Sequence, residues 1–375
     1  MTISRNAGSS RPLTDAMRDE SSDTSPTSAR PLRMALGVVL SVLAVVLLAF
    51  AALVVGRSIH RGAIPGPPRD ASELGPMPQS DAAWAPLLDE FALAGAVDDE
   101  TVRELLYRMP SRTEVRAVME RRPAPAFRAL DESIDRWFVS PLVDGCTDPF
   151  RCVVALSRGT DAVEVMAVYR WARGDVTGAS RLLEAFLRST VVTARTARSE
   201  SVQSTALSGL AEILRVLRDL DARDRHDAAE ARVLTPTLAD FVAELADLDV
   251  DLWRPWIAEM QVTAPELATF QATAQPRTRF FIDAPSLATE LYASYESCIR
   301  AARSGAPIDG SMSVHVPTLD DEWFVAEEDG FALAGLEGDC GRLLEGERYD
   351  LEHVHDDAHD LATCGSCDAD VTELR

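Results

Sequence analysis

The sequence predicts an all-α protein in which an N-terminal transmembrane helix precedes an irregular helical bundle or hairpin-type domain. Apolar residues recur at spacings of three and four from residue 81 to about residue 305, and helix-capping patterns separate these segments. Runs that alternate apolar and polar residues, as half-buried strands do, are scarce. We therefore assign a helical domain to residues 81–305.

Residues Met34–Val55 form an apolar run of 22 residues that is bounded by Arg33 and Arg57. At about 1.5 Å per residue, a helix of this length extends roughly 33 Å, which is enough to cross a hydrocarbon core of about 30 Å. We predict a transmembrane helix at residues 34–56. The Ser- and Thr-rich leader at residues 1–33 has too few apolar residues to fold and is predicted to be disordered.

A cleaved signal peptide is the alternative, since Ala49-Phe50-Ala51 matches a cleavage-site pattern. The long leader and the full-length span favour an uncleaved anchor. The Arg residues on the two sides of the span nearly balance, so charge counting alone leaves the orientation open. We place the N-terminus in the cytoplasm, because the long C-terminal part is the natural exported domain. The predicted location is thus the inner membrane, single-pass, with a periplasmic C-terminal domain.

Two segments flank the predicted helical domain. Residues 57–80 are rich in Pro and are predicted to be a semi-extended linker. Residues 306–375 carry 19 acidic residues against 3 Arg, which predicts an acidic, mostly disordered tail. Within that tail, residues 323–334 are a candidate for a small β-hairpin.

The basic residues are all Arg, because the chain contains no Lys. This excludes phosphate-binding loops, kinase sites and Schiff-base sites that depend on Lys. Residues 70–375 hold 29 Arg against 56 acidic residues, a net charge of −27. Such a charge disfavours nucleic acid and favours cations or basic surfaces. We expect contact with the membrane through residues 34–55 and a protein partner, with a basic surface favoured, but no nucleic acid.

Six cysteines all follow the apolar run. An even number in an exported domain predicts disulfides, although the sequence does not determine the pairing. The preferred short-range pairs are Cys146 with Cys152 and Cys364 with Cys367, which leaves Cys298 and Cys340. Cys298 also falls on the apolar stripe of a predicted helix, where a buried free thiol is ordinary.

Local signals place individual helices within the domain. A capping box at residues 111–114 begins one helix, and Thr235 followed by Pro236 begins another. Asp98 or Asp99 is a candidate cap for the helix that precedes the first of these. Apolar stripes within residues 201–220 and 283–305 predict two longer helices.

Residues 161–188 form the clearest unit, two helical patterns separated by a turn at residues 174–175. This helical hairpin resembles one tetratricopeptide unit, in which Gly-Asp separates the helices and a small residue follows, here Ala179. Arg170 stands where that repeat has an aromatic residue, which is found instead at position 169. Gly-Asp does not recur one repeat length away, so an irregular bundle is favoured over a repeat array.

The layout of the chain combines an anchor, a Pro-rich spacer, a Trp-bearing first helix and a Gly-Asp hairpin. The segment Pro276–Phe281 then leads into a last long helix. This layout resembles uncharacterised single-pass membrane-anchored helical proteins of Gram-negative bacteria with Arg-biased coding. The resemblance covers most of residues 30–305 and implies location and class only.

Metal-ligand residue types gather near the C-terminus, at His353, His355, His359, Cys364 and Cys367. On a helix the second and third of these His would point the same way, with Asp in the place that Glu holds in a zinc-protease pattern. The alternatives are a solvated tail with a local disulfide, a site for zinc or another transition metal, and a redox-active Cys-x-x-Cys pair.

No catalytic residues and no cofactor site are predicted elsewhere in the sequence. The function indicated is a membrane-tethered helical scaffold or protein-interaction module outside the cytoplasm, with no catalytic activity evident. The alternative is a metal-binding or thiol-redox protein that uses the C-terminal His/Cys cluster.

Overall fold

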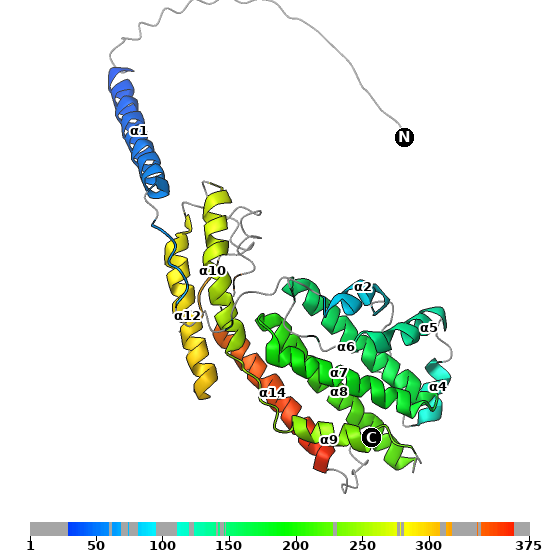
Figure 1. Ribbon diagram of the computed structural model, residues 1–375. Helices are drawn as coiled ribbons and strands as arrows, with labels where there is room; N and C mark the ends of the chain where they lie inside the picture. Colours follow the sequence, from blue (N-terminus) through cyan, green and yellow to red (C-terminus); the bar gives the residue numbers. More distant parts are fainter. Residues whose placement is uncertain are drawn as a thin grey trace, which may run out of the picture. The chain divides into compact units, whose positions relative to one another are not determined.

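The computed structural model divides the chain into two units, Met1–His60 and Arg61–Arg375 (Figure 1). The structure describes residues 29–59, 62–68, 82–94, 111–119, 124–139, 148–227, 231–275, 281–307, 313–316 and 339–363, together with residues 74, 142, 146, 278 and 336. Within these residues the protein is all-helical, as predicted, and an isolated bridge between Ser313 and Asp339 is the only β-type pairing.

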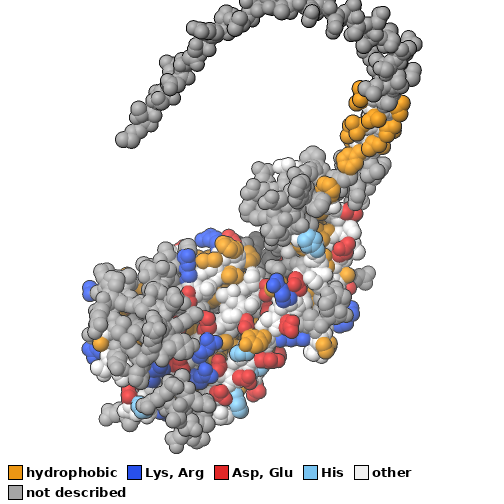
Figure 2. Space-filling view, turned by 180° about the vertical axis from the view of Figure 1, so that it is seen from behind, with side chains coloured by type: hydrophobic (Ala, Val, Ile, Leu, Met, Phe, Trp, Pro, Cys, Tyr) orange, Lys and Arg blue, Asp and Glu red, His pale blue; other side chains and the backbone are white. Residues whose placement is uncertain are grey.

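The described part of the first unit is one helix, α1 (Ala29–Ile59), which begins inside the segment predicted as the leader. Its described side chains, at residues 36–52 and 55, are all exposed. The large apolar ones are between 53% and 70% exposed, and Figure 2 shows hydrophobic side chains along this helix in orange. Among the described residues, no helix combines the length and the apolar character needed to cross a membrane.

The second unit is built on the helical hairpin that the sequence predicts. Helix α6 (Pro149–Ala172) turns at Gly174 into α7 (Val176–Thr196), and Gly174 has a φ of 89°, a conformation that a side chain would strain. Asp175 then caps α7, because its carboxylate accepts a hydrogen bond from the Gly178 amide at 3.0 Å. Local residue choices thus fix the direction of both helices.

Helix α8 (Glu200–His226) contacts both helices of this hairpin and completes a three-helix core. Three short helices also contact α6, namely α2 (Ala85–Ala94), α4 (Arg112–Met119) and α5 (Ala124–Ser133), which a short 3-10 turn, η2 (Ile134–Arg136), follows. Helix α4 begins at the predicted capping box. The predicted cap at Asp98 or Asp99 lies outside the described residues.

Buried charge at the end of α8 ties these helices together. The Asp224 carboxylate is fully buried and accepts hydrogen bonds from the Trp171 indole at 2.8 Å and from the Val233 amide at 2.7 Å. Arg112 of α4 forms an ion pair with the same carboxylate. One turn earlier, the buried Asp221 is paired with two Arg residues. Buried carboxylates are tolerated when charge-assisted hydrogen bonds compensate for lost water.

The rest of the described second unit includes α9 and α12, which local sequence signals predict, and α10 and α14, which they do not. Helix α9 (Pro236–Leu245) is capped by Thr235, and α10 (Arg254–Thr273) pairs with α12 (Ala284–Ser304). Trp256 of α10 stacks on Tyr295 of α12 with ring centroids 6.1 Å apart, and both are fully buried. Helix α12 ends at Gly305 in the left-handed conformation, as a C-terminal glycine predicts.

The prediction of a mostly disordered tail at residues 306–375 is wrong for helix α14 (Cys340–Thr363), which packs against α8, α9 and α12. Buried residues recur along it at helical spacing, whereas acidic residues occupy the exposed side. The buried positions are Cys340, Gly341, Leu344, Glu347, Val354, Ala358 and Leu361. The buried stripe was not predicted from the sequence, because the high proportion of acidic residues indicated a disordered tail. The candidate β-hairpin at residues 323–334, and Cys364 with Cys367, lie outside the described residues.

Two disulfides crosslink the described part of the second unit. Cys146 is bonded to Cys152, which confirms the predicted short-range pair. Cys298 of α12 is bonded to Cys340, the first residue of α14, with their Cα atoms 6.2 Å apart. The alternative that Cys298 is a free buried thiol is therefore wrong. This second disulfide links the first residue of α14 covalently to α12.

Replacing Cys298 and Cys340 together by Ala is expected to lower the free energy of unfolding by about 4 kcal/mol, because the crosslink spans 42 residues. The same change at Cys146 and Cys152, which are separated by 6 residues, should cost about 2 kcal/mol. Urea unfolding of the whole chain in detergent micelles measures both losses. Equal losses would contradict the loop-length argument.

Candidate functional site: an arginine-centred groove

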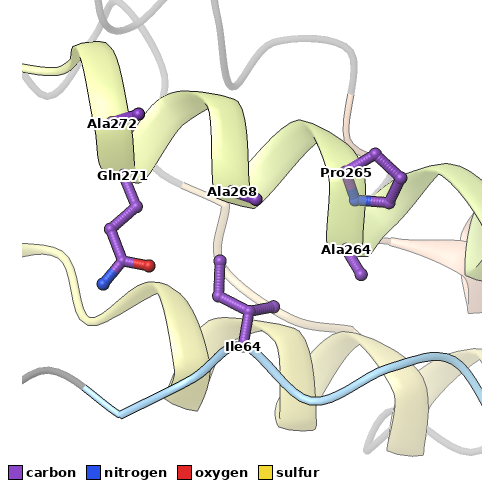
Figure 3. A pocket seen from close by; sticks show the side chains of 6 residues that line it. All are labelled: Ile64, Ala264, Pro265, Ala268, Gln271 and Ala272. Atoms are coloured by element: carbon purple, nitrogen blue, oxygen red, sulfur yellow. The ribbon is translucent and has the colours of Figure 1, made fainter.

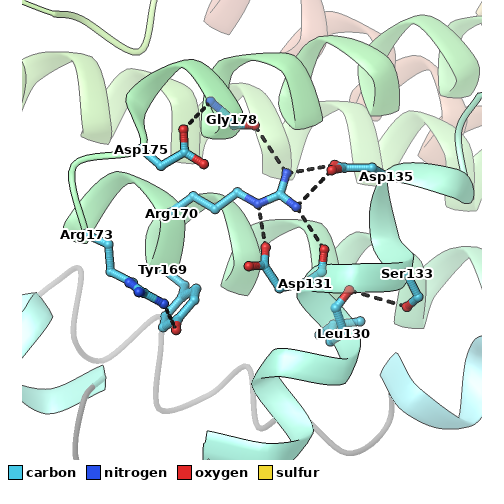
Figure 4. A network of polar contacts seen from close by, with 9 residues as sticks. All are labelled: Leu130, Asp131, Ser133, Asp135, Tyr169, Arg170, Arg173, Asp175 and Gly178. Atoms are coloured by element: carbon cyan, nitrogen blue, oxygen red, sulfur yellow. Dashed lines mark hydrogen bonds and ion pairs between the residues drawn. The ribbon is translucent and has the colours of Figure 1, made fainter.

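Arg170, near the C-terminal end of α6, lies at the centre of a polar network that joins α5, η2 and the α6–α7 hairpin (Figure 4). Its Nε donates to Asp131 at 2.7 Å, and its two terminal nitrogens donate to the two carboxylate oxygens of Asp135 at 2.7 and 3.1 Å. The backbone oxygens of Asp131 and Gly178 accept further hydrogen bonds at 3.1 and 3.4 Å.

These contacts use all of the guanidinium donors, because Arg has about five N–H groups and each is directed at an oxygen. Burial alone would lower the pKa of Arg170, but the hydrogen bonds and charges of Asp135 and Asp131 outweigh it and raise the pKa. Arg170 therefore stays charged and holds the surrounding elements in place. It does not offer a free donor to a ligand.

A groove of about 500 Å³ opens beside this network. We call it the Arg170 groove. Buried apolar side chains of Ile134, Phe138 and Leu182 contribute to its lining. Exposed polar side chains contribute as well, among them Thr177 and Arg181 of α7. The groove thus combines an apolar lining with polar groups from separate elements.

The charge of the groove comes mainly from carboxylates. Asp131 and Asp135 are 35% and 61% exposed, so each keeps access to water although both bind Arg170. Asp175 is exposed at the start of α7. Since Arg170 is saturated, an incoming group meets these carboxylates and the guanidinium of Arg181. This arrangement suits an apolar side chain of a partner together with a neighbouring polar or basic group.

A second hollow, of about 630 Å³, lies between α10 and the extended segment that carries Ile64 (Figure 3). Among the described residues that line it, Gln271 is the one with a polar side chain and the others are small or apolar. None of these described lining residues carries a charge. Although larger, this hollow offers fewer groups for specific recognition than the Arg170 groove.

The sequence-predicted metal residues fall partly on α14. One ring nitrogen of His353 is 2.8 Å from the Tyr349 carbonyl oxygen, and Nε2 of His355 is 2.8 Å from that of Leu248. His359 is exposed. Across the described residues, no group of three or more His, Cys, Asp or Glu is arranged to hold a metal ion.

No protein-family model, curated protein or solved structure matches the chain.

Sequence reasoning did not identify the Arg170 groove, although part of its signal was visible. Arg170 interrupts the apolar stripe of a predicted helix, and Asp131 and Asp135 stand four residues apart, so that on a helix both carboxylates share a face. The sequence pattern does not indicate that Arg170 contacts these two carboxylates, since they lie 35 to 39 residues from it along the chain.

Replacing Arg170 by Met should lower the free energy of unfolding by about 2 kcal/mol, because the change removes the hydrogen bonds that join α5 and η2 to the hairpin. Asp131 and Asp135 are partly hydrated, which keeps the cost below that of a fully buried pair. Urea denaturation of both proteins checks the loss.

The matched control is Arg173→Met, which removes an exposed Arg that lies over the Tyr169 ring. Its expected cost is below about 0.5 kcal/mol, as for ordinary surface substitutions. Equal costs for the two variants would show that the Arg170 network does not hold the elements together.

Proposed function

We propose that the protein is a membrane-tethered helical interaction module whose folded part lies outside the cytoplasm. The observation that carries the proposal is the apolar surface of α1, where the large hydrophobic side chains are more than half exposed over consecutive turns. Exposing such a surface to water is costly, and burial in lipid removes that cost. Such a helix accounts for a single-pass anchor, and the long C-terminal part, as the natural exported domain, places the N-terminus in the cytoplasm.

The proposed anchor is longer than the part of α1 whose side chains the structure describes. Those side chains include residues 36–52 and 55, and no described helix meets the requirement for a membrane span. The proposal instead rests on the whole apolar run Met34–Val55 within a helix of 31 residues. A length of about 20 apolar residues is what a hydrocarbon core requires.

The two disulfides support the location outside the cytoplasm. Disulfides persist in oxidising compartments such as the periplasm and are rare where thiol-reducing systems operate. The Cys298–Cys340 bond connects helices that are distant in sequence, so its formation is part of the final fold. An inner-membrane protein with a periplasmic helical domain accounts for both the crosslinks and the apolar helix.

The Arg170 groove supports a binding role for the exported domain. It combines an apolar lining with exposed carboxylates, and the chain after residue 69 has a net charge of −27. We infer a protein partner that inserts an apolar side chain and places a basic residue near Asp135 or Asp175. Charges of opposite sign on the partner speed the encounter and disfavour acidic competitors.

Metal binding or thiol-redox chemistry at the C-terminal His/Cys cluster is the alternative function. It has less support, because among the described residues no group of three or more His, Cys, Asp or Glu is arranged to hold a metal ion. Zinc retained by the purified chain, and lost on replacing His353, His355 and His359 by Ala, would favour this alternative.

Maleimide labelling tests the topology. With the outer membrane opened and the inner membrane intact, the cysteines should react only after reduction, because the domain is exported and crosslinked. A Ser9→Cys variant is the control, since its thiol should react only when the inner membrane is also opened. Native thiols that require inner-membrane opening would place the domain in the cytoplasm and overturn the proposal.

A photoreactive residue tests the groove. Because the chain contains no Lys, amine-directed crosslinkers have no side-chain target on it. Benzoylphenylalanine is therefore introduced at Thr177, the second residue of α7, and in a control at Thr237, the second residue of α9. Both positions are exposed, and Thr177 contributes to the groove lining.

Irradiated cells should give a discrete adduct from position 177 and not from position 237. For a basic partner, the yield from isolated membranes should fall as salt is raised, since screening weakens attraction between exposed charges. Identical adducts at both positions, or none at 177, would count against the Arg170 groove as the binding surface.

A further inference from the structure

Glu347 is a buried acid without a hydrogen-bond partner. It lies on α14, is 0% exposed, and neither oxygen of its carboxyl group has a hydrogen bond in the described part of the chain. By contrast, the buried Asp221 and Asp224 are each saturated by Arg or N–H donors. An ionised carboxylate in such surroundings is strongly disfavoured, because it loses water and gains nothing in exchange.

The charged groups that shift the pKa of Glu347 are themselves acidic, so they repel its ionised form. Glu200, at the start of α8, and Asp350, three residues along α14, both raise the pKa of Glu347, and desolvation by burial is the largest cause of the increase. Asp350 also accepts a hydrogen bond from Ser208 of α8 at 2.7 Å. The interface of α8 and α14 therefore brings acidic groups together.

The other elements packed against α14 do not neutralise this acid. The acidic residues of α9, Asp240 and Glu244, are exposed, and so are the charged residues of α12. Tyr295 of α12 is a buried titratable group. The neighbouring Arg348 of α14 is directed elsewhere, since it donates to the Ala301 and Ala306 carbonyl oxygens at 2.6 and 2.8 Å. The charged residues of α12 are Glu290, Glu296, Arg300 and Arg303.

We propose that Glu347 makes the docking of α14 on α8 dependent on a bound proton. With the proton in place the acid is neutral and α14 packs fully. Without it, the buried charge drives the middle of α14 away from α8 toward water. Opening breaks the Ser208–Asp350 and Arg218–Asp357 contacts, which join the two helices.

The disulfide gives this movement a fixed end. Cys340 lies about two turns before Glu347 and is bonded to Cys298, so α14 remains attached to α12 when its middle part moves. The apolar side chains Leu344, Val354 and Ala358 would become accessible, together with the parts of α8 that they cover. Loss of a proton thus exposes a hydrophobic face that the docked helix hides.

The direction of the effect follows from the two states. In the open state Glu347 titrates near its ordinary pKa of 4.5, whereas in the docked state its pKa lies well above that value. When the pH lies between these two pKa values, Glu347 is protonated in the docked state and ionised in the open state. Docking is therefore complete below pH 4.5 and weakens by up to about tenfold per pH unit as the pH rises through the docked pKa.

Amide hydrogen exchange of the whole chain in detergent micelles tests the proposal. Protection factors for amides of residues 344–358, corrected for the intrinsic exchange rate at each pH, are measured at pH 5 and at pH 8.5. They should fall at least tenfold in the native protein. Glu347→Gln, which carries no charge at either pH, should remove the pH dependence and keep the pH 5 protection.

Glu345→Gln is the matched control, because Glu345 lies exposed on the same helix and its replacement should leave the native pH dependence unchanged. Glu200→Gln removes one repulsive carboxylate and so lowers the pKa of Glu347 in the docked state, hence the fall in protection between pH 5 and pH 8.5 should be smaller than in the native protein. Native protection that does not change with pH would overturn the proposal, as would a pH dependence that survives in Glu347→Gln.

Discussion

The folded unit depends on how it neutralises charge that is buried along α8. The Asp224 carboxylate is bound by groups from α4, α6 and the segment before α9, so one buried charge positions three parts of the chain. The positive charge of Arg170 likewise positions three elements, α5, η2 and α7. An unpaired ion at either place would cost several kcal/mol, and this cost selects one arrangement of the helices. Glu347 departs from this pattern, which makes it the natural place for a change of state.

Local signals predicted the elements whose ends are coded by a few adjacent residues. The Gly174 turn, the Thr235 cap and the Gly305 end are all found at the predicted positions, because capping contacts lie within one helical turn. Helix α14 escaped prediction for a different reason. Its buried stripe is there in the sequence, but Glu347 occupies one position of the stripe and acids fill the exposed side, so composition suggested a solvated tail.

The candidate site was less accessible to sequence reasoning than the fold. Arg170 could be recognised as out of place in an apolar stripe, yet its partners lie on α5 and η2, and no local rule links them. The groove exists only because those elements fold back onto the hairpin. Tertiary pairing of this kind depends on the shape of the packed helices, which a single sequence does not display.

The bond between Cys298 and Cys340 also determines how the chain responds to cleavage. A protease that cuts anywhere between these two residues separates the backbone into two pieces, yet the sulfur bridge keeps both in one covalent particle. Helix α14 would thus remain at high effective concentration beside α8 and could rebind. Cleavage of the intervening segment would therefore leave α14 covalently attached to the rest of the protein. Reduction of the Cys298–Cys340 bond would then free α14 as part of a separate peptide.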